Sequence, residues 1–274
     1  MSLADLQGTY RDWTLPRGIN GTVVLVVLLL SLWQLVSLGF DSHVFPGLLE
    51  IGEALQLILA GGTRHTFLGN VSVTIIRIIA SVIISMLIGV PLGIGIGIRS
   101  EIEDFTMLYL LVLLAVPVII WSFLAVVWFG RSTYFLPLFA GVAALLPYVI
   151  INTWKGVEDI NKQIVEMATV FDANQPSIWR RVYIPHLKPY LFSTTRMVVS
   201  VAWRVMLIIE VFGTGSGLGY VLNGYFISQR NDMLVAWSLP VMVCIFGLER
   251  LLKRVEARSF EYRDQDEPDQ MTVA

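Results

Sequence analysis

The chain has 274 residues, of which 55% are hydrophobic and only 15% are charged, and its net charge is −2. Soluble domains carry about 25% charged residues, so this composition indicates a chain whose main solvent is lipid. The small net charge gives no reason to expect a nucleic-acid partner. A single cysteine, Cys244, excludes an internal disulfide framework and is expected to be a buried apolar side chain.

Six segments are long and apolar enough to be membrane spans, which need about 20 residues each. In chain order they are residues 22–40, 71–98, 107–129, 134–151, 190–212 and 233–252. The first is longer than the apolar region of a signal peptide and is not followed by an A-x-A cleavage site, so we expect it to be retained. The sequence therefore predicts an all-α, polytopic membrane protein with six transmembrane helices.

The distribution of lysine and arginine predicts the orientation of these spans. With a cytoplasmic N-terminus, only Arg64, Arg131 and Arg230 lie outside, and Arg77, Arg196 and Arg204 lie within spans. The inner set is Arg11, Arg17, Arg99, Lys155, Lys162, Arg180, Arg181, Lys188, Arg250, Lys253, Arg254, Arg258 and Arg263. This bias predicts that both termini are cytoplasmic. Arg77 and Arg196 lie near the ends of their spans, where we expect them to snorkel towards the interface.

Glycine recurs every four residues in the second predicted span, at Gly89, Gly93 and Gly97. Small residues at this spacing allow two helices to approach closely. We expect these glycines to form a tight helix contact, either inside the bundle or at a dimer seam. Pro91, in the same segment, predicts a kink.

The sequence holds no motif for the chemistry of a pump or an enzyme. It lacks the G-x-x-x-x-G-K-[ST] loop that binds nucleotide phosphates, so we expect neither ATP hydrolysis nor a cofactor in this chain. Its three histidines, His43, His65 and His186, lie far apart in predicted loops, which predicts no catalytic residues and no metal site. The stretch FGTGSGLGY, residues 212–220, does not match G-x-G-x-x-G and is expected to form a flexible outer turn.

A long polar loop, residues 152–189, lies on the predicted cytoplasmic side between the fourth and fifth spans. Connections between bundle helices usually take about 2–8 residues, so this loop is expected to have structure of its own. An apolar stripe predicts a helix over residues 162–171. Asn174 is the expected cap of a second helix, with Pro176 in its first turn.

This loop resembles the EAA loop of permease subunits in binding-protein-dependent ABC importers. That signature runs E-A-A, three residues, G and, further on, I-x-L-P. Glu166, Met167 and Ala168 match the triplet, with Met in the middle position, and Ile184–Pro185 match the closing pair. Asp172 stands where the family has glycine.

Glycine at that position lets the backbone turn between two helices. Aspartate is among the few residues that tolerate a left-handed conformation, so we expect the turn to be kept at Asp172. Pro185 and Pro189 are expected to end the cytoplasmic piece and to fix the start of the fifth span.

Several further stretches resemble the branch of this family that imports aliphatic sulfonates, taurine, nitrate or bicarbonate. They are FPGLLEIGEAL, SVTIIRIIASVIISMLIGVPLGIGIGI, NTWKGVEDI and AWRVMLIIEVFGTGSGLGY. The resemblance implies a bacterial inner-membrane protein with the type I ABC importer permease fold. It also implies a pathway formed by two permease subunits, expected to be a homodimer, and an extracytoplasmic binding protein that delivers a small anionic solute. Two partner ATPase subunits would carry the ATP and Mg²⁺.

The resemblance assigns the cytoplasmic loop a coupling role, in which it docks in a groove on an ATPase subunit and transmits the closure driven by ATP. Glu166, Arg180 and Arg181 are its expected polar contacts. The alternative is that they are ordinary charges facing water or lipid headgroups.

Besides Arg196 near its inner end, the fifth span contains Arg204 and closes with Glu210. Charges at membrane depth are costly and usually functional. Our hypothesis is that Arg204 faces the pathway and attracts an anionic group, with Trp203, Glu210 and Trp121 as further pathway candidates. The alternative is a structural pair between Arg204 and Glu210 or a polar group of another helix. Six residues place Arg204 and Glu210 about 120° apart around the helix, which disfavours a direct pair.

The expected domain organisation is a cytoplasmic segment at 1–20, a transmembrane permease domain at 21–260 and a disordered cytoplasmic tail at 261–274. The alternative functions are a secondary transporter or channel without an ATPase, an intramembrane enzyme, and a scaffold or receptor. The sequence shows neither the internal repeats nor the intramembrane carboxylates expected of a proton-coupled transporter. A requirement for an ATPase partner would separate the importer from all three alternatives.

Overall fold

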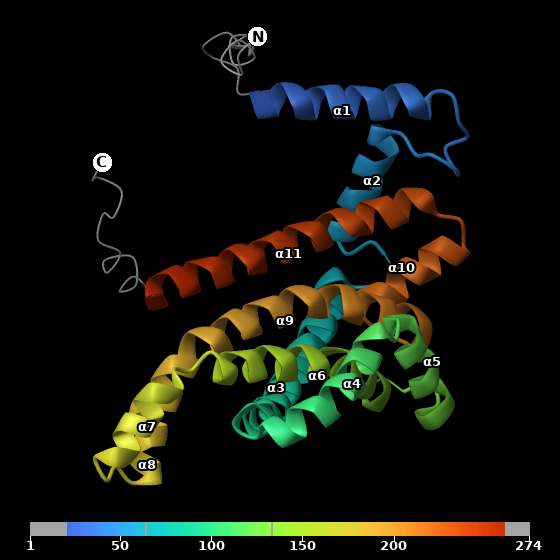
Figure 1. Cartoon of the computed structure of the whole chain (residues 1–274). Helices are drawn as coiled ribbons and strands as arrows, with labels where there is room; N and C mark the ends of the chain where they lie inside the picture. The colour runs from blue at the N-terminus through green and yellow to red at the C-terminus, as the bar shows by residue number, and fades with distance from the viewer. Residues whose placement is uncertain (1–20, 64, 133, 261–274) are drawn as a thin grey trace, which may run out of the picture.

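The computed structural model describes residues 21–260 apart from Arg64 and Thr133, and every regular element in that part of the chain is helical. Figure 1 shows their arrangement. The elements are α1 (Gly21–Ser37), α2 (Leu48–Leu59), α3 (Phe67–Ile98), α4 (Ser100–Ala115), α5 (Val118–Phe129), α6 (Phe135–Glu158), α7 (Lys162–Val170), α8 (Gln175–Ile178), a π-helical turn (Trp179–Tyr183), α9 (Ile184–Gly213), α10 (Leu218–Ile227) and α11 (Asn231–Phe260). The all-α prediction is confirmed. The predictions for residues 1–20 and 261–274 lie outside the described residues.

Three helices are long and apolar enough to cross a bilayer singly, namely α3, α6 and the first part of α11. Two further spans arise if each of two bent helix pairs counts as one, α4 with α5 and the α8–α9 rod with α10. α1 is apolar but only 17 residues long. The chain is therefore a multi-pass membrane protein with three to five spans by length and composition, and α1 would be needed to reach the predicted six.

The third predicted span is broken instead of straight. α4 and α5 meet at an angle of 89°. The break falls at Val116, whose backbone is extended, and at Pro117, which precedes α5. Proline lacks an amide N–H and disfavours a helical conformation in the residue before it, which favours a break in the apolar run from 107 to 129 at this point.

The α3–α6 contact is built on the glycines at four-residue spacing. A Cβ atom at Gly93 would lie 2.7 Å from the carbonyl oxygen of Ile150, and one at Gly97 would lie 2.7 Å from Cβ of Val157. Gly89 is packed equally closely against Val149. These contacts lie within one chain, so the glycine stripe is a bundle contact and not a dimer seam. α3 is helical throughout, with Pro91 inside it.

The core lies where α3, α6 and α9 meet, and α10 and the first half of α11 close it at one end. Its largest fully buried side chains include Trp203 and Trp237. α7 and α8 project from the opposite end (Figure 1). Arg131 and Arg230, which the charge bias places outside, follow α5 and α10 at the end away from α7 and α8.

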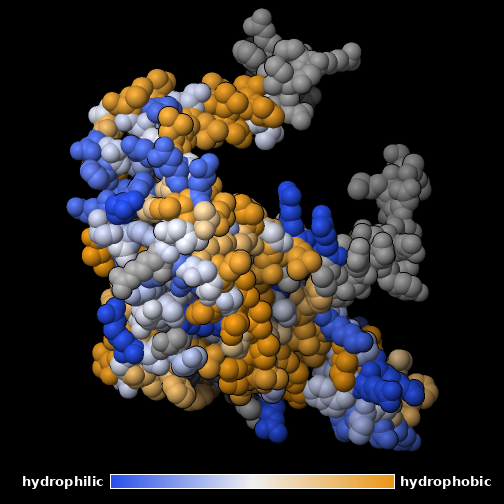
Figure 2. Space-filling model, turned by 180° about the vertical axis from the view of Figure 1, so that it is seen from behind, coloured by the Kyte–Doolittle hydropathy of each residue, from blue (hydrophilic) through white to orange (hydrophobic). Residues whose placement is uncertain are grey.

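Much of the apolar surface is left uncovered by the residues that the structure describes. α1 stands apart from the bundle, joined to it through α2, and none of its residues is buried. A broad apolar surface also covers the side of the bundle shown in Figure 2. A soluble monomer rarely exposes apolar patches larger than a few hundred Å², so this surface agrees with a chain surrounded by lipid or by other membrane subunits.

Adding a methyl group in the α3–α6 contact should destabilise the protein. At Gly93 the new carbon would meet the backbone of Ile150, which cannot rotate away, so we expect Gly93→Ala to lower the free energy of unfolding by about 1–3 kcal/mol. Gly95 on the same helix has no atom within 4 Å of its Cβ position, and Gly95→Ala is the matched control. Thermal unfolding of the detergent-solubilised proteins would measure both. Equal midpoints for the two variants would contradict the packing described.

Candidate functional site

The predicted cytoplasmic loop, residues 152–189, contains two capped helices. The side chain of Asn161 accepts a hydrogen bond from the amide of Gln163 at the start of α7. The side chain of Asn174 accepts one from the amide of Ser177 at 3.1 Å, and Pro176 lies in the first turn of α8. The prediction that Asn174 caps a second helix is confirmed. Each cap satisfies an amide that the helix itself leaves without an acceptor.

Asp172 forms the turn between these helices, with a φ of +56°. Its amide donates to the carbonyl of Thr169, and the amide of Ala173 donates to the carbonyl of Ala168, both at 3.0 Å. This pair of bonds is the Schellman motif, in which the left-handed residue is most often glycine. Aspartate therefore keeps the turn that the family makes with glycine, as its tolerance of left-handed backbone predicts.

The second helix does not end at Pro185 or Pro189, and the predicted role of the two prolines is wrong. α8, the π-helical turn and α9 form one continuous rod, Gln175–Gly213. Pro185 lies in the first turn of α9 and Pro189 lies inside it. The irregularity is the π turn, where the amide of Ile184 donates to the carbonyl of Trp179, five residues back. The change of register directly precedes Pro185, whose missing N–H would have interrupted an α-helical ladder.

The loop presents a mixed apolar and charged surface. Glu166, Met167, Asp172, Arg180, Arg181 and Pro185 are exposed, and Ala168 is half-buried. Val170 and Phe171 are each 79% exposed. Between α7 and the body of the protein lies a cleft of about 400 Å³, lined in part by Glu103, Lys162 and Glu166. The loop is thus a compact projection that exposes Val170 and Phe171 at its surface.

The four pathway candidates are not brought together. Trp203 is 2% exposed and Glu210 is fully buried, so both lie in the interior of the chain. Arg204, next to Trp203, is exposed on α9. Trp121 lines an apolar cavity of about 520 Å³ formed by residues of α3, α4, α5 and α6. Only Arg204 and Trp121 therefore reach a surface or cavity of this chain.

Glu210 forms an ion pair, and its partner is Arg77. Nη1 of Arg77 lies 2.6 Å from Oε1 of Glu210, with side-chain exposures of 8% and 0%. The expectation that Arg77 snorkels is wrong, because its guanidinium points into the protein. It also donates to the carbonyl and to the hydroxyl of Ser216, each at 2.8 Å. An alternative raised for Arg204, a pair with Glu210, is excluded by this arrangement.

The carboxylate of Glu210 accepts from two further donors. The hydroxyl of Thr74 lies 2.9 Å from Oε2, and the amide of Gly219 lies 3.0 Å from the same atom. A charge buried away from water needs such partners. Sequence reasoning missed this site, although two charges of opposite sign in different spans were a usable signal.

The glycine-rich stretch is part of this site and is not a loose turn. Gly217 has a φ of +102°, and a Cβ there would fall on the carboxylate of Glu210. A Cβ at Gly219 would lie 2.3 Å from the carbonyl oxygen of Leu207. The amide of Gly217 donates to Oδ1 of Asn70 at 3.0 Å. The prediction of a flexible turn is therefore wrong for residues 214–219, which are held by direct contacts.

Comparison with known proteins shows which family the chain resembles. The family described as "Binding-protein-dependent transport system inner membrane component" matches residues 89–260, more than half of the chain. The taurine transport system permease protein TauC of Escherichia coli is 23% identical over 254 residues, covering 90% of each protein. The riboflavin transport system permease protein RibX of Chloroflexus aurantiacus is 30% identical, covering 52% of this chain and 56% of RibX.

The fold is similar to that of a solved transporter. A chain in an inward-facing structure of the MetNI methionine ABC transporter aligns with a TM-score of 0.59 and 16% identity, covering 69% of this chain and 94% of that one. The family match, the helical membrane fold and the EAA-like loop with its Schellman turn lead to one conclusion. The chain belongs to the family of inner-membrane permease components of binding-protein-dependent ABC transporters, and it is not itself a catalytic subunit.

Proposed function

We propose that two copies of this chain form the translocation pathway of an ATP-driven importer for a small anionic solute of the sulfonate, taurine, nitrate or bicarbonate type. A separate extracytoplasmic protein delivers the solute. Two ATPase subunits, which hold the ATP and Mg²⁺, dock on the cytoplasmic loops of residues 152–189. The observation that carries the proposal is the exposed Arg204 on a membrane helix.

Arg204 lies twenty residues along α9 from Ile184 and is exposed on the surface of the chain. Placing an arginine at the centre of a bilayer costs about 2.5–3.5 kcal/mol on insertion scales and more in simulations. A surface that faces lipid is therefore a poor environment for this side chain, whereas a hydrated pathway between two permease subunits is a good one. There the guanidinium can pair with a sulfonate or carboxylate in a forked geometry.

The exposed apolar residues of α7 support ATPase docking. Val170 and Phe171 lie at the end of α7, beside the left-handed turn at Asp172. Burying an apolar side chain of this size stabilises a complex by about 1.5–3 kcal/mol. Glu166, Arg180 and Arg181 are exposed on the same loop and can form the polar rim of the contact.

Membership of the permease family argues against the alternative of a secondary transporter or channel without an ATPase. The homodimer is supported by the large apolar surface that the described residues leave uncovered, which includes the whole length of α1. The apolar cavity beside Trp121 opens on the same bundle and is a second candidate surface for the pathway.

Tagged protein purified gently from its native membrane should carry an ATPase subunit with it. We expect Phe171→Ser to weaken this association by at least about tenfold, because an apolar contact is lost. Phe226→Ser on α10, whose side chain is 66% exposed away from the loop, is the matched control and should retain the ATPase. Quantitative mass spectrometry of the purified material measures the ratio. A wild-type chain that purifies alone and moves solute without ATP would disprove the importer.

The turn between α7 and α8 should tolerate glycine but not valine at position 172. A β-branched side chain in the left-handed region costs roughly 1–2 kcal/mol. We therefore expect Asp172→Val to speed hydrogen exchange of the α7 amides by about 5–30-fold, and Asp172→Gly to leave it unchanged or slower. Similar exchange rates in the two variants would argue against a fixed turn at this residue.

Removing the charge at Arg204 should weaken transport of an anionic solute. We expect Arg204→Gln to raise the solute concentration needed for half-maximal uptake by about tenfold, the value of one charge-assisted hydrogen bond. Arg204→Lys keeps the charge and should recover most of the activity. Uptake of labelled taurine or another sulfonate into cells or proteoliposomes measures both. An unchanged uptake curve for Arg204→Gln would refute the pathway role.

A further inference from the structure

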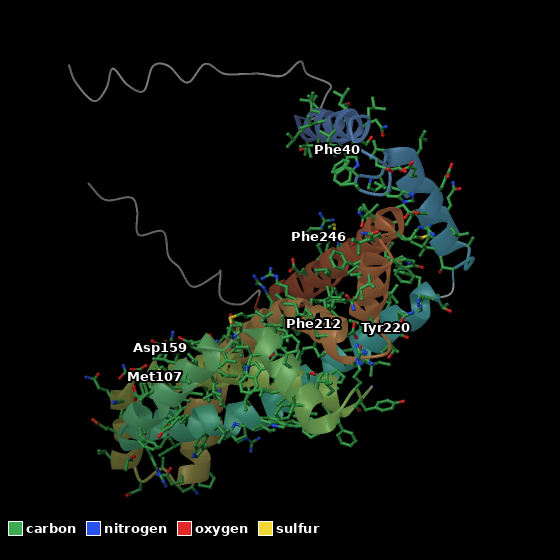
Figure 3. All side chains as sticks on the ribbon, turned by 90° about the vertical axis from the view of Figure 1, so that its right-hand side faces the viewer. Phe40, Met107, Asp159, Phe212, Tyr220 and Phe246 are labelled. Carbon is green, nitrogen blue, oxygen red and sulfur yellow. The ribbon has the colours of Figure 1, made fainter. Side chains whose placement is uncertain are left out.

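The rod Gln175–Gly213 connects the two ends of the molecule. At 1.5 Å per residue it is roughly 58 Å long, and it begins in the coupling loop. Figure 3 shows Asp159, which belongs to that loop, at one end of the bundle, and Phe212 and Tyr220, which flank residues 213–219, towards the other. A movement of the loop is therefore applied to the same helix that carries Glu210 at its far end.

The far end of this rod is fastened to two other helices by side chains. Glu210 accepts from Arg77 and Thr74 of α3, and from the amide of Gly219 in the first turn of α10. The hydroxyl of Thr74 also accepts from the amide of Leu218 at 2.9 Å. Asn70, one turn before Thr74 on α3, accepts from the amide of Gly217. Three consecutive amides at the start of α10 are thus bound by side chains of α3 and α9.

The bend between the rod and α10 is 53°. The connecting residues include Gly215, whose Cβ position has no neighbour within 4 Å, and Gly217, with a φ of +102°. A backbone of this kind would permit many angles by itself. The angle observed is therefore set by the hydrogen bonds to Glu210, Thr74 and Asn70.

We propose that Glu210 and Arg77 are positioning residues for transport, which clamp α10 and residues 214–217 to the end of the α9 rod and to α3. When ATP closure moves the coupling loop, α10 then moves with the rod and opens or closes the outer mouth of the pathway. This inference rests on the proposed function, because the coupling loop must receive its motion from an ATPase.

Glu210→Gln is the test, because it keeps the size of the side chain and one acceptor oxygen but removes the charge that holds Arg77. The complete transporter, with the ATPase and binding protein that purify with it, is reconstituted in proteoliposomes. We expect assembly to be retained and basal ATP hydrolysis to stay within about twofold of wild type, whereas solute uptake per ATP falls at least tenfold. A purely structural role would lower assembly and hydrolysis together. Glu249→Gln, the same change on α11, is the control and should leave all three quantities unchanged.

Thr74→Val provides a milder variant of similar shape, which removes the hydroxyl shared by Glu210 and the amide of Leu218. It should reduce solute uptake per ATP several-fold. If the Glu210→Gln transporter fails to assemble, Thr74→Val tests the clamp in its place. If a variant assembles and its solute uptake per ATP equals that of the wild type, the proposed clamping role is wrong. A wild-type chain that binds no ATPase would overturn the proposed function instead, so the two failures are distinguishable.

Discussion

The carboxylate of Glu210 has to find its hydrogen-bond donors inside the protein, because hydrocarbon supplies none. It finds them on α3 and α10, which lie far from it in sequence or beyond a bend in the chain. The glycines at 217 and 219 are required by the same contact, since a side chain there would displace the carboxylate or the backbone of α9. One buried charge thus fixes the mutual positions of three helices and of the segment that joins two of them.

The opposite end of the molecule is held in shape by contacts between residues that are close in sequence. The loop that carries α7 and α8 is shaped by backbone hydrogen bonds, two asparagine caps and one left-handed aspartate. Its form is therefore largely local, and it leaves the side chains of Val170 and Phe171 exposed. A stiff, locally determined projection at one end and a polar cluster at the other are joined by one continuous helix.

Features that depend on local geometry could be predicted from the sequence. The cap at Asn174, the turn at Asp172 and the close packing of Gly93 each follow from a residue and its neighbours. Features that depend on distant partners could not. The apolar pattern from 107 to 129 does not reveal the angle at Pro117, and the position of Arg77 near a span end fits snorkelling as well as burial. Only the three-dimensional structure shows that the side chain facing Arg77 is Glu210.

The ion pair also has a consequence for how the protein is made. Arg77 is synthesised 133 residues before Glu210, which at about 5–20 residues per second corresponds to a delay on the order of ten seconds. During that interval α3 carries an arginine with no carboxylate to meet it. The ion pair can form only once α9 has been synthesised, so the burial of the Arg77 guanidinium against Glu210 is a late event in biogenesis.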